Sequence, residues 1–316
     1  MTPRWQLGID LGGTKIEAAL LTPAGELHWQ KRLATPQGDY DQTVATVATL
    51  VHQAREQVFG SFSSSGFSHL GFSQLGFSHV GVGIPGSVSA LTGRIKNANS
   101  TCLIGQDLAA DLQSVTGCPV RLANDANCFA LSEASDGAAR DVAVVFGVIL
   151  GTGCGGGLVI NGQIVNGANA IAGEWGHNPM PWLTPSEQRF DRPCYCGKTH
   201  CVETYLSGPG FSGWASHRLG RALTPPELVS LADQGDEKAK ACLEAYAHWL
   251  ARGLATVINV VDPDAIVLGG GLSQMRYLYE RVPQIWSDYV FSDQVVTRLL
   301  PPRWGDASGV RGAAWL

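Results

Sequence analysis

The fold is decided by residues 5–21, which read WQLGIDLGGTKIEAALL. Two short apolar runs, residues 5–10 and 16–21, stand on either side of a Gly-Gly-Thr sequence. Short runs of this composition interrupted by glycine are typical of strands joined by a turn. This stretch therefore predicts a strand, a turn and a second strand near the start of the chain.

The same plan returns in the middle of the chain. Residues 142–150 form a strongly apolar run, a glycine-rich stretch follows at 151–157, and a second apolar run occupies 158–160. The repeated plan of strand, glycine turn and strand predicts two α/β lobes of like architecture that face each other across a cleft.

Helices and further strands complete the predicted lobes. Apolar residues recur at helical spacing over 41–58 and 237–261, so both segments predict helices with one buried face. Shorter elements are expected as strands at 80–84, 120–123 and 265–268, and as a helix at 308–316. The predicted lobes comprise residues 1–122 with a C-terminal helix near 305–316, and residues 123–304.

Composition and charge narrow the class of protein. With 316 residues, of which 45% are hydrophobic, the chain can bury two modest cores. Its net charge is −5 and no segment gathers Lys and Arg, so neither nucleic acid nor an anionic membrane is expected as a partner. The N-terminus lacks the apolar core of a signal peptide. We therefore expect a cytoplasmic protein whose eight Cys stay reduced.

Residues 66–80 contain an unusual repeat, GFSHL, GFSQL and GFSHV. A five-residue period fits neither a helix nor a simple strand, and the unit is far shorter than the repeats of solenoid proteins. We predict an expanded surface loop at 61–80 without a role in the chemistry. The alternative is a sticky apolar patch made by the three phenylalanines.

Glycine clusters follow three of the apolar runs, at residues 12–13, 151–157 and 269–271. Glycine has no Cβ, so a phosphate chain or a purine can approach the backbone N–H groups of such turns closely. One cluster alone is more typical of a tight hairpin, whereas three favour a nucleotide-binding cleft. Neither the P-loop sequence nor the Rossmann fingerprint is present, which argues against both of those folds.

Charged and hydroxyl side chains flank the first glycine turn, where residues 10–15 read DLGGTK. Asp10 is a candidate ligand for hydrated Mg²⁺, because magnesium prefers few carboxylates together with waters and phosphate oxygens. The pair Asn124 and Asp125 is ambiguous, since both residue types commonly cap helices. The functional alternative is that Asp125 accepts the proton of a sugar hydroxyl and aims its oxygen at the γ-phosphate of a nucleotide.

The stretch from 173 to 203 is the most specific part of the chain. His177, Cys194, Cys196 and Cys201 offer one imidazole and three thiolates, which suit a closed, structural zinc site. The alternatives are buried cysteines beside a surface histidine, or a zinc hydrolase, which would need an open coordination position. Near these candidate ligands, Glu174 and Glu203 are either rigid acceptors for sugar hydroxyls or surface acids.

Taken together, these motifs and their order resemble the ROK family of sugar kinases and sugar-responsive repressors. The resemblance spans nearly the whole chain, and its details are most similar to bacterial fructokinases that also accept mannose. The motifs that carry it are DLGGTK at 10–15, GIPG at 83–86, ND at 124–125, GTG at 151–153, GEWGH at 173–177, CYCG at 194–197, CVE at 201–203 and GGG at 269–271.

This resemblance implies a two-lobed actin-like ATPase fold, of the ribonuclease H-like type. It implies transfer of the γ-phosphoryl group of ATP to the C6 hydroxyl of a hexose, with Asp125 as catalytic base. Implied sugar-binding residues are Gly86, Asn99, Asn124, Asp125, Glu174, His177 and Glu203. Implied MgATP-binding residues are Asp10, Gly12, Gly13, Thr14, Lys15, Gly151, Thr152, Gly153, Gly269 and Gly270.

The same resemblance favours fructose, then mannose, with a glucokinase or an N-acetylhexosamine kinase as alternatives, and a homodimer as the assembly. A repressor is disfavoured, because no helix-turn-helix segment precedes the first turn. One position departs from the family pattern: His200 stands where a glycine is usual, so either the turn is strained or the imidazole approaches the metal.

Overall fold

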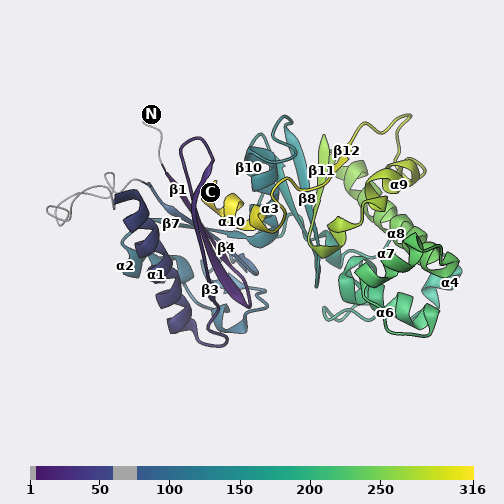
Figure 1. Ribbon diagram of the computed structural model, residues 1–316, viewed down its shortest axis with the longest axis horizontal. Helices are drawn as coiled ribbons and strands as arrows, with labels where there is room; N and C mark the ends of the chain where they lie inside the picture. Colours follow the sequence, from purple (N-terminus) through teal and green to yellow (C-terminus); the bar gives the residue numbers. More distant parts are fainter. Residues whose placement is uncertain (1–4, 60–76) are drawn as a thin grey trace. The chain divides into compact units, whose positions relative to one another are not determined.

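The computed structural model describes residues 5–59 and 77–316, which group into two compact units (Figure 1). The first unit comprises Met1–Asp136, Val165–Ala172 and Ala307–Leu316, and the second comprises Gly137–Ile164 and Gly173–Asp306. Most of the predicted repeat loop lies outside the described residues. In its third copy, Phe77 is buried, with the guanidinium of Arg55 6.0 Å from its ring centroid.

The first unit is built on a five-stranded mixed sheet with the order β3-β2-β1-β4-β7. The predicted strand, turn and strand form its centre, where Asp10 pairs with Glu17 across the antiparallel β1 and β2. Strands β4 and β7 continue the sheet in parallel with β1. The strands are β1 (Gln6–Leu11), β2 (Lys15–Leu21), β3 (Leu27–Ala34), β4 (Val80–Ile84) and β7 (Val120–Asn124).

Helices cover both faces of this sheet: α1 and α2 on one, and α3 with α10 on the other (Figure 1). Their bounds are Tyr40–Phe59, Leu108–Thr116, Asp125–Ser135 and Ser308–Ala314. Helix α10 lies unusually close to the sheet, because a Cβ at Gly8 would stand 2.1 Å from the Val310 carbonyl oxygen and one at Gly81 would stand 1.7 Å from that of Ala313. Because these positions in β1 and β4 are glycine, α10 can pack directly against the strand that carries Asp10.

The second unit repeats the plan of the first, with the sheet order β10-β9-β8-β11-β12. Three antiparallel strands are again followed by two parallel ones. The strands are β8 (Val144–Leu150), β9 (Cys154–Ile160), β10 (Gln163–Ile164), β11 (Ala265–Gly269) and β12 (Arg298–Leu300). The predicted glycine turn is shorter than expected, because residues 155–157 belong to β9.

Helices of the second unit pack around α8 (Glu237–Val261), whose bounds match the prediction. Its buried face joins the largest apolar cluster of the unit, together with α9 (Tyr277–Trp286). The remaining helices are α4 (Pro185–Gln188), α5 (Glu203–Leu206), α6 (Gly208–Leu219) and α7 (Pro225–Asp233). None of the helices within residues 5–59 and 77–316 is both long and apolar enough to cross a membrane.

Residues 123–136, which the sequence analysis places in the second lobe, group with the first unit. The physical reason is the close packing of α3 on α10, where a Cβ at Gly312 would stand 1.7 Å from the carbonyl oxygen of Cys128. A partly buried ion pair between Arg311 and Asp136 joins the same two segments. The helix that begins at Asp125 is therefore fixed to the unit that contains Asp10.

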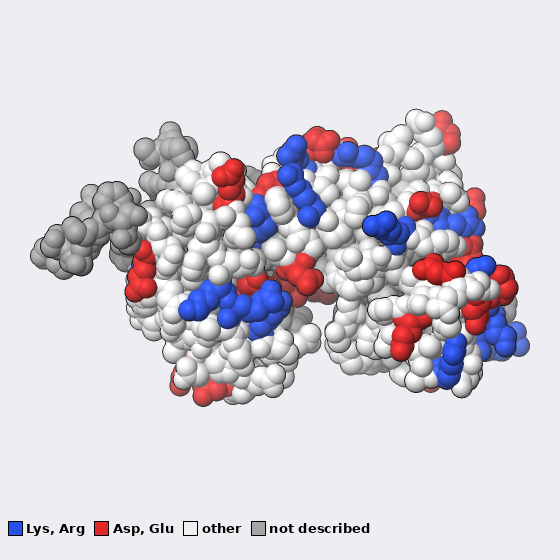
Figure 2. Space-filling model, in the orientation of Figure 1, with Lys and Arg blue, Asp and Glu red and all other residues white. Residues whose placement is uncertain are grey.

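Charged side chains of both signs lie next to one another on the face drawn in Figure 2, rather than gathering into one basic surface. A partly buried pair in the second unit has a structural role: Arg252, on α8, lies 2.7 Å from Glu187, on α4. The Trp249 ring N–H also donates to Glu187. Burial raises the pKa of Glu187, but its hydrogen bonds outweigh burial and lower that pKa to about 2.

We expect Glu187→Gln to lower the free energy of unfolding by about 2 kcal/mol, because it leaves the buried Arg252 guanidinium without its charge partner. Since the pKa of Glu187 is lowered, from 4.5 to about 2, the pair stabilises the fold above roughly pH 4.5 and this contribution is lost as the pH falls toward 2. Urea unfolding of the wild-type and Glu187→Gln proteins at pH 7 and at pH 3 measures this contribution, and the difference between the two proteins should be smaller at pH 3.

The matched control is Glu244→Gln, which breaks a more exposed pair with Arg281. Its two side chains are each 34% exposed, against 4% and 20% for Arg252 and Glu187. We expect this control to cost under about 1 kcal/mol. Equal losses for the two variants would contradict the structural role of Glu187.

Candidate functional site

The first glycine turn is held by a hydrogen bond across the turn to β2 and by another from the chain that follows β3. The N–H of Gly12 donates to the Lys15 carbonyl at 3.0 Å, and the Thr35 hydroxyl donates to the Gly12 carbonyl at 2.7 Å. Lys15 itself lies 3.6 Å from Glu17, a carboxylate that is 1% exposed and also pairs with Arg32. The predicted nucleotide-binding lysine is therefore paired within its own sheet in this structure.

Asp10 and Asp125 lie close enough in the first unit to interact electrostatically. Asp10 ends the part of β1 that pairs with β4, and Asp125 is the first residue of α3. Burial, followed by the negative charges of Asp125 and Glu17, raises the pKa of Asp10 to about 6. A partly buried carboxylate whose pKa is raised by neighbouring carboxylates, at the end of a strand that leads into a glycine turn, is a suitable place for a divalent cation.

Both interpretations of Asn124 and Asp125 have a counterpart in the structure. Asn124 is the N-cap of α3, since its side-chain oxygen accepts the N–H of Ala126 at 2.9 Å. Its amide donates to the carbonyl of Gly86 at 3.0 Å, which brings two predicted sugar-binding residues together. Asp125 is exposed, and one of its oxygens accepts the N–H of Ala126 at 2.8 Å. A carboxylate at a helix N-terminus is stabilised in its ionised form.

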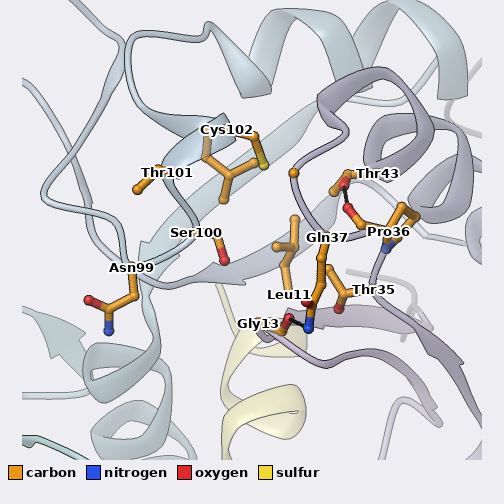
Figure 3. Close-up of a pocket in the computed structure, with 12 residues that line it drawn as sticks. Leu11, Gly13, Thr35, Pro36, Gln37, Thr43, Asn99, Ser100, Thr101 and Cys102 are labelled. Carbon is orange, nitrogen blue, oxygen red and sulfur yellow. Dashed lines mark hydrogen bonds between the residues drawn. The ribbon is translucent and has the colours of Figure 1, made fainter.

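A cavity of about 240 Å³ lies beside the first glycine turn (Figure 3). It is formed by the turn, by the loop at 35–38 and by residues 99–103. Figure 3 shows Gln37 reaching the Gly13 carbonyl, while the Asn99 side chain stands at the edge of the cavity. No side chain that lines it is charged. This cavity was not predicted, because it is assembled from three separated segments.

In the second unit, the turn at 151–153 is fixed from two sides. The N–H of Gly208, at the start of α6, donates to the Gly151 carbonyl at 2.7 Å. Gly270 has a φ of +79°, and a Cβ there would stand 2.4 Å from the Leu150 carbonyl oxygen. Gly270 of the third glycine cluster therefore packs against Leu150, the residue that directly precedes the second cluster.

Glu203 lies directly against this turn. Its Oε2 accepts the N–H of Cys154 at 3.0 Å, and a Cβ at Gly153 would stand 2.8 Å from the same oxygen. Glycine at 153 is thus required for Glu203 to keep its place. Glu174 is exposed and directly precedes the short 3-10 helix Trp175–His177, which packs against β9. The packing is close, because a Cβ at Gly176 would stand 2.1 Å from the Cys154 carbonyl oxygen.

The four predicted zinc ligands converge, with their ligand atoms all within 4.8 Å of one another. The Sγ atoms of Cys196 and Cys201 are 3.6 Å apart, and Cys194 Sγ lies 3.6 Å from His177 Nδ1. A tetrahedral zinc ion with bonds of about 2.0–2.3 Å separates its ligand atoms by roughly 3.5–3.8 Å, so the donor set and spacing fit this metal. A backbone hydrogen bond near Lys198 lowers the pKa of Cys196 to about 7.

His200 settles the choice that the family pattern left open. Its φ is +57°, a left-handed conformation that favours glycine, so the turn is strained. Its Nδ1 lies 2.7 Å from the Tyr205 hydroxyl, and it is not among the grouped metal-ligand candidates. The expectation that this imidazole approaches the metal is wrong, because the ring hydrogen-bonds to Tyr205 instead.

Sequence reasoning missed two residues of this unit. Gly208 was not predicted, although a Ser-Gly-Pro-Gly sequence opening a helix was a usable signal. Tyr195 was also missed: its hydroxyl lies 2.9 Å from Nε2 of His177. Its place between two cysteine ligands could have indicated this neighbourhood.

Comparison with known proteins agrees with the fold and the motifs. The ROK family model matches residues 6–316. The N-acetyl-D-glucosamine kinases of Shigella flexneri serotype 5b and of Escherichia coli K12 (DH10B) are each 40% identical over 312 residues, which cover 98% of both chains.

Two solved structures show the same fold. A ROK hexokinase from Thermus thermophilus has a TM-score of 0.81 at 28% identity, over 98% of this chain and 97% of that one. A ROK glucokinase from Streptomyces griseus, solved with glucose and AMPPNP, has a TM-score of 0.74 at 25% identity, over 98% of each. The predicted actin-like ATPase fold is confirmed, and the chain belongs to the ROK family.

Proposed function

We propose that this protein is an ATP-dependent kinase that transfers the γ-phosphoryl group to the C6 hydroxyl of N-acetyl-D-glucosamine. The reaction class is supported by the carboxylate pair beside a glycine turn in a ROK chain. The sugar is supported by one observation above all, the 40% identity over 98% of both chains to relatives named N-acetyl-D-glucosamine kinase. That observation favours the N-acetylhexosamine alternative of the sequence analysis over fructose, which stays unconfirmed.

Asp125 is proposed as the base because of its position. It is exposed at the N-terminus of α3, where the positive end of the helix dipole favours a negative charge and where a substrate hydroxyl could reach it. Phosphoryl transfer depends on positioning and on late proton removal, so an ordinary carboxylate is basic enough. Asn124 and Gly86, which are hydrogen-bonded to each other, would orient the sugar beside it.

Asp10 is proposed to hold the magnesium that accompanies ATP. Magnesium bound there would neutralise the developing charge on the phosphate oxygens. The raised pKa of Asp10 fits this role, since a cation would relieve its repulsion from Asp125 and Glu17. Backbone N–H groups of the two glycine turns are proposed to bind the phosphates. The residues proposed to bind MgATP are Asp10, Gly12, Gly13, Thr14, Lys15, Gly151, Thr152, Gly153, Gly269 and Gly270.

A structural zinc ion is proposed at His177, Cys194, Cys196 and Cys201. Four good ligands close a tetrahedral site and leave no position for a reactive water, which disfavours a hydrolase. Zinc would brace the segments that carry Glu174 and Glu203, the two carboxylates proposed to accept sugar hydroxyls. The homodimer and the cytoplasmic location remain predictions.

An ADP-release assay across a panel of hexoses tests the substrate. We expect the highest kcat/KM with N-acetyl-D-glucosamine, lower values with glucose and mannose, and the lowest with fructose. Because specificity arises from the pairing of individual hydroxyl and amide groups, the preferred sugar should lead by about tenfold or more. If fructose leads the panel, the assignment to N-acetyl-D-glucosamine is wrong. If no sugar raises ADP release above background, the kinase proposal itself fails.

A further inference from the structure

The Tyr195 hydroxyl is hydrogen-bonded to Nε2 of His177, the ring nitrogen that is not directed at Cys194. The hydroxyl lies 2.9 Å from Nε2, and the two rings meet edge to face with centroids 5.1 Å apart. The other nitrogen, Nδ1, is directed at Cys194 Sγ at 3.6 Å. With Nδ1 in a metal-ligand position, Nε2 carries the ring proton and donates it to the Tyr195 oxygen.

The Tyr195 side chain can leave this position without disturbing the turn that carries it. The backbone is held by the Cys194 N–H, which donates to the Lys198 carbonyl at 2.8 Å, and by the Gly197 N–H, which donates to the Cys194 carbonyl at 3.0 Å. By contrast, Tyr195 is 80% exposed. Rotamer changes of exposed side chains are fast compared with turnover.

The surroundings of Tyr195 connect it to the residues proposed to bind the sugar. Tyr195 and Glu203 line one cavity of about 580 Å³ in the second unit. A phenolic hydroxyl offers the same hydrogen-bonding groups as a sugar hydroxyl, one O–H donor and one acceptor oxygen.

We propose that the Tyr195 hydroxyl stands in for a sugar hydroxyl at Nε2 of His177, so that the hexose displaces Tyr195 when it binds. The inference rests on the proposed function, in which His177 contacts the sugar. In the sugar-free protein Tyr195 keeps the imidazole hydrogen-bonded and correctly turned. Breaking its bond to His177 opposes sugar binding, so Tyr195 sets the sugar affinity without taking part in the chemical step.

The test is Tyr195→Phe, measured by steady-state kinetics with N-acetyl-D-glucosamine and by calorimetry of sugar binding without ATP. Removing one competing neutral hydrogen bond should lower the sugar KM and Kd about 2- to 10-fold. We expect kcat, the KM for ATP and the zinc content to stay unchanged. An unchanged or raised sugar KM would overturn the proposal, because Tyr195 would then be a bystander or a direct support of the bound sugar.

Tyr277→Phe is the matched control, since it removes another phenolic hydroxyl of the second unit, one hydrogen-bonded to Glu244. We expect it to leave the sugar KM unchanged. Different results would refute the proposed function and the role of Tyr195. If the wild-type protein phosphorylates no hexose, the proposed function fails; if it does so and Tyr195→Phe does not lower the sugar KM, only the role of Tyr195 fails.

Discussion

Replacing Asp125 with Asn is expected to lower kcat about 10²- to 10⁴-fold, the range that a positioned base contributes. The amide has nearly the shape of the carboxylate and can still accept the Ala126 N–H, so α3 should keep its start. What it loses is the ability to take the proton of the sugar hydroxyl. Steady-state kinetics with ATP and N-acetyl-D-glucosamine give the loss, and calorimetry with ADP should show nucleotide affinity changed by less than about threefold.

Asp107→Asn is the matched control for this variant. Asp107 also begins a helix of the first unit, where its side chain accepts the Ala110 N–H at 3.3 Å, and it is assigned no part in the chemistry. Asn caps helices about as well as Asp, so stability and kcat should both stay near normal. Near-normal turnover in Asp125→Asn would show that this carboxylate is not the base.

Removing one of the four proposed zinc ligands is expected to have the second large effect. Cys201→Ser replaces a buried thiolate by a poor zinc ligand, and we expect metal content to fall from one zinc per chain toward none. The unfolding free energy should fall by about 2–5 kcal/mol. The sugar KM should rise about 10-fold or more, because Glu203 lies two residues further along the chain. Metal analysis, thermal unfolding and kinetics together measure this.

Cys242→Ala is the control, since it removes a buried cysteine of the same unit that is not one of the four proposed zinc ligands. It should keep its zinc and its sugar KM. A zinc hydrolase would lose its chemical step at unchanged substrate affinity when the metal is removed. If the Cys201 variant showed that pattern, or if the wild-type protein contained no zinc, the structural role would be refuted.

Much of the fold was predictable because its signals are local. The helix at 237–261 has the predicted bounds, because its apolar spacing is a local signal and because Asp262, which adopts a left-handed conformation before Pro263, ends it. Strand β3 was not predicted, because Leu27–Ala34 is largely exposed and lacks a buried run. The residues at 155–157 were assigned to a turn, although they belong to β9, where Gly156 leaves room for the Gly173 carbonyl and the Trp175 ring.

The candidate site, too, was predictable only where its signals are local in the sequence. The cluster of the four candidate zinc ligands was predictable, because His and Cys are rare residue types and these four lie within one short stretch of the sequence. The direction of the His200 ring was not, since it depends on Tyr205, which is placed by the packing of α5 on α8. The pairing of Lys15 with Glu17 was also missed, although both residues belong to β2 and the alternation of side chains along a strand places residues two apart on the same face.

The most direct test of the central claim is the identity of the product. Incubation of the wild-type protein with ATP, Mg²⁺ and N-acetyl-D-glucosamine, followed by phosphorus and proton NMR, shows where the phosphate resides. We expect N-acetyl-D-glucosamine 6-phosphate and ADP in equal amounts, with no sugar phosphate formed by the Asp125→Asn protein on the same timescale. Free inorganic phosphate with the sugar unchanged, or a phosphate on another hydroxyl, would contradict it.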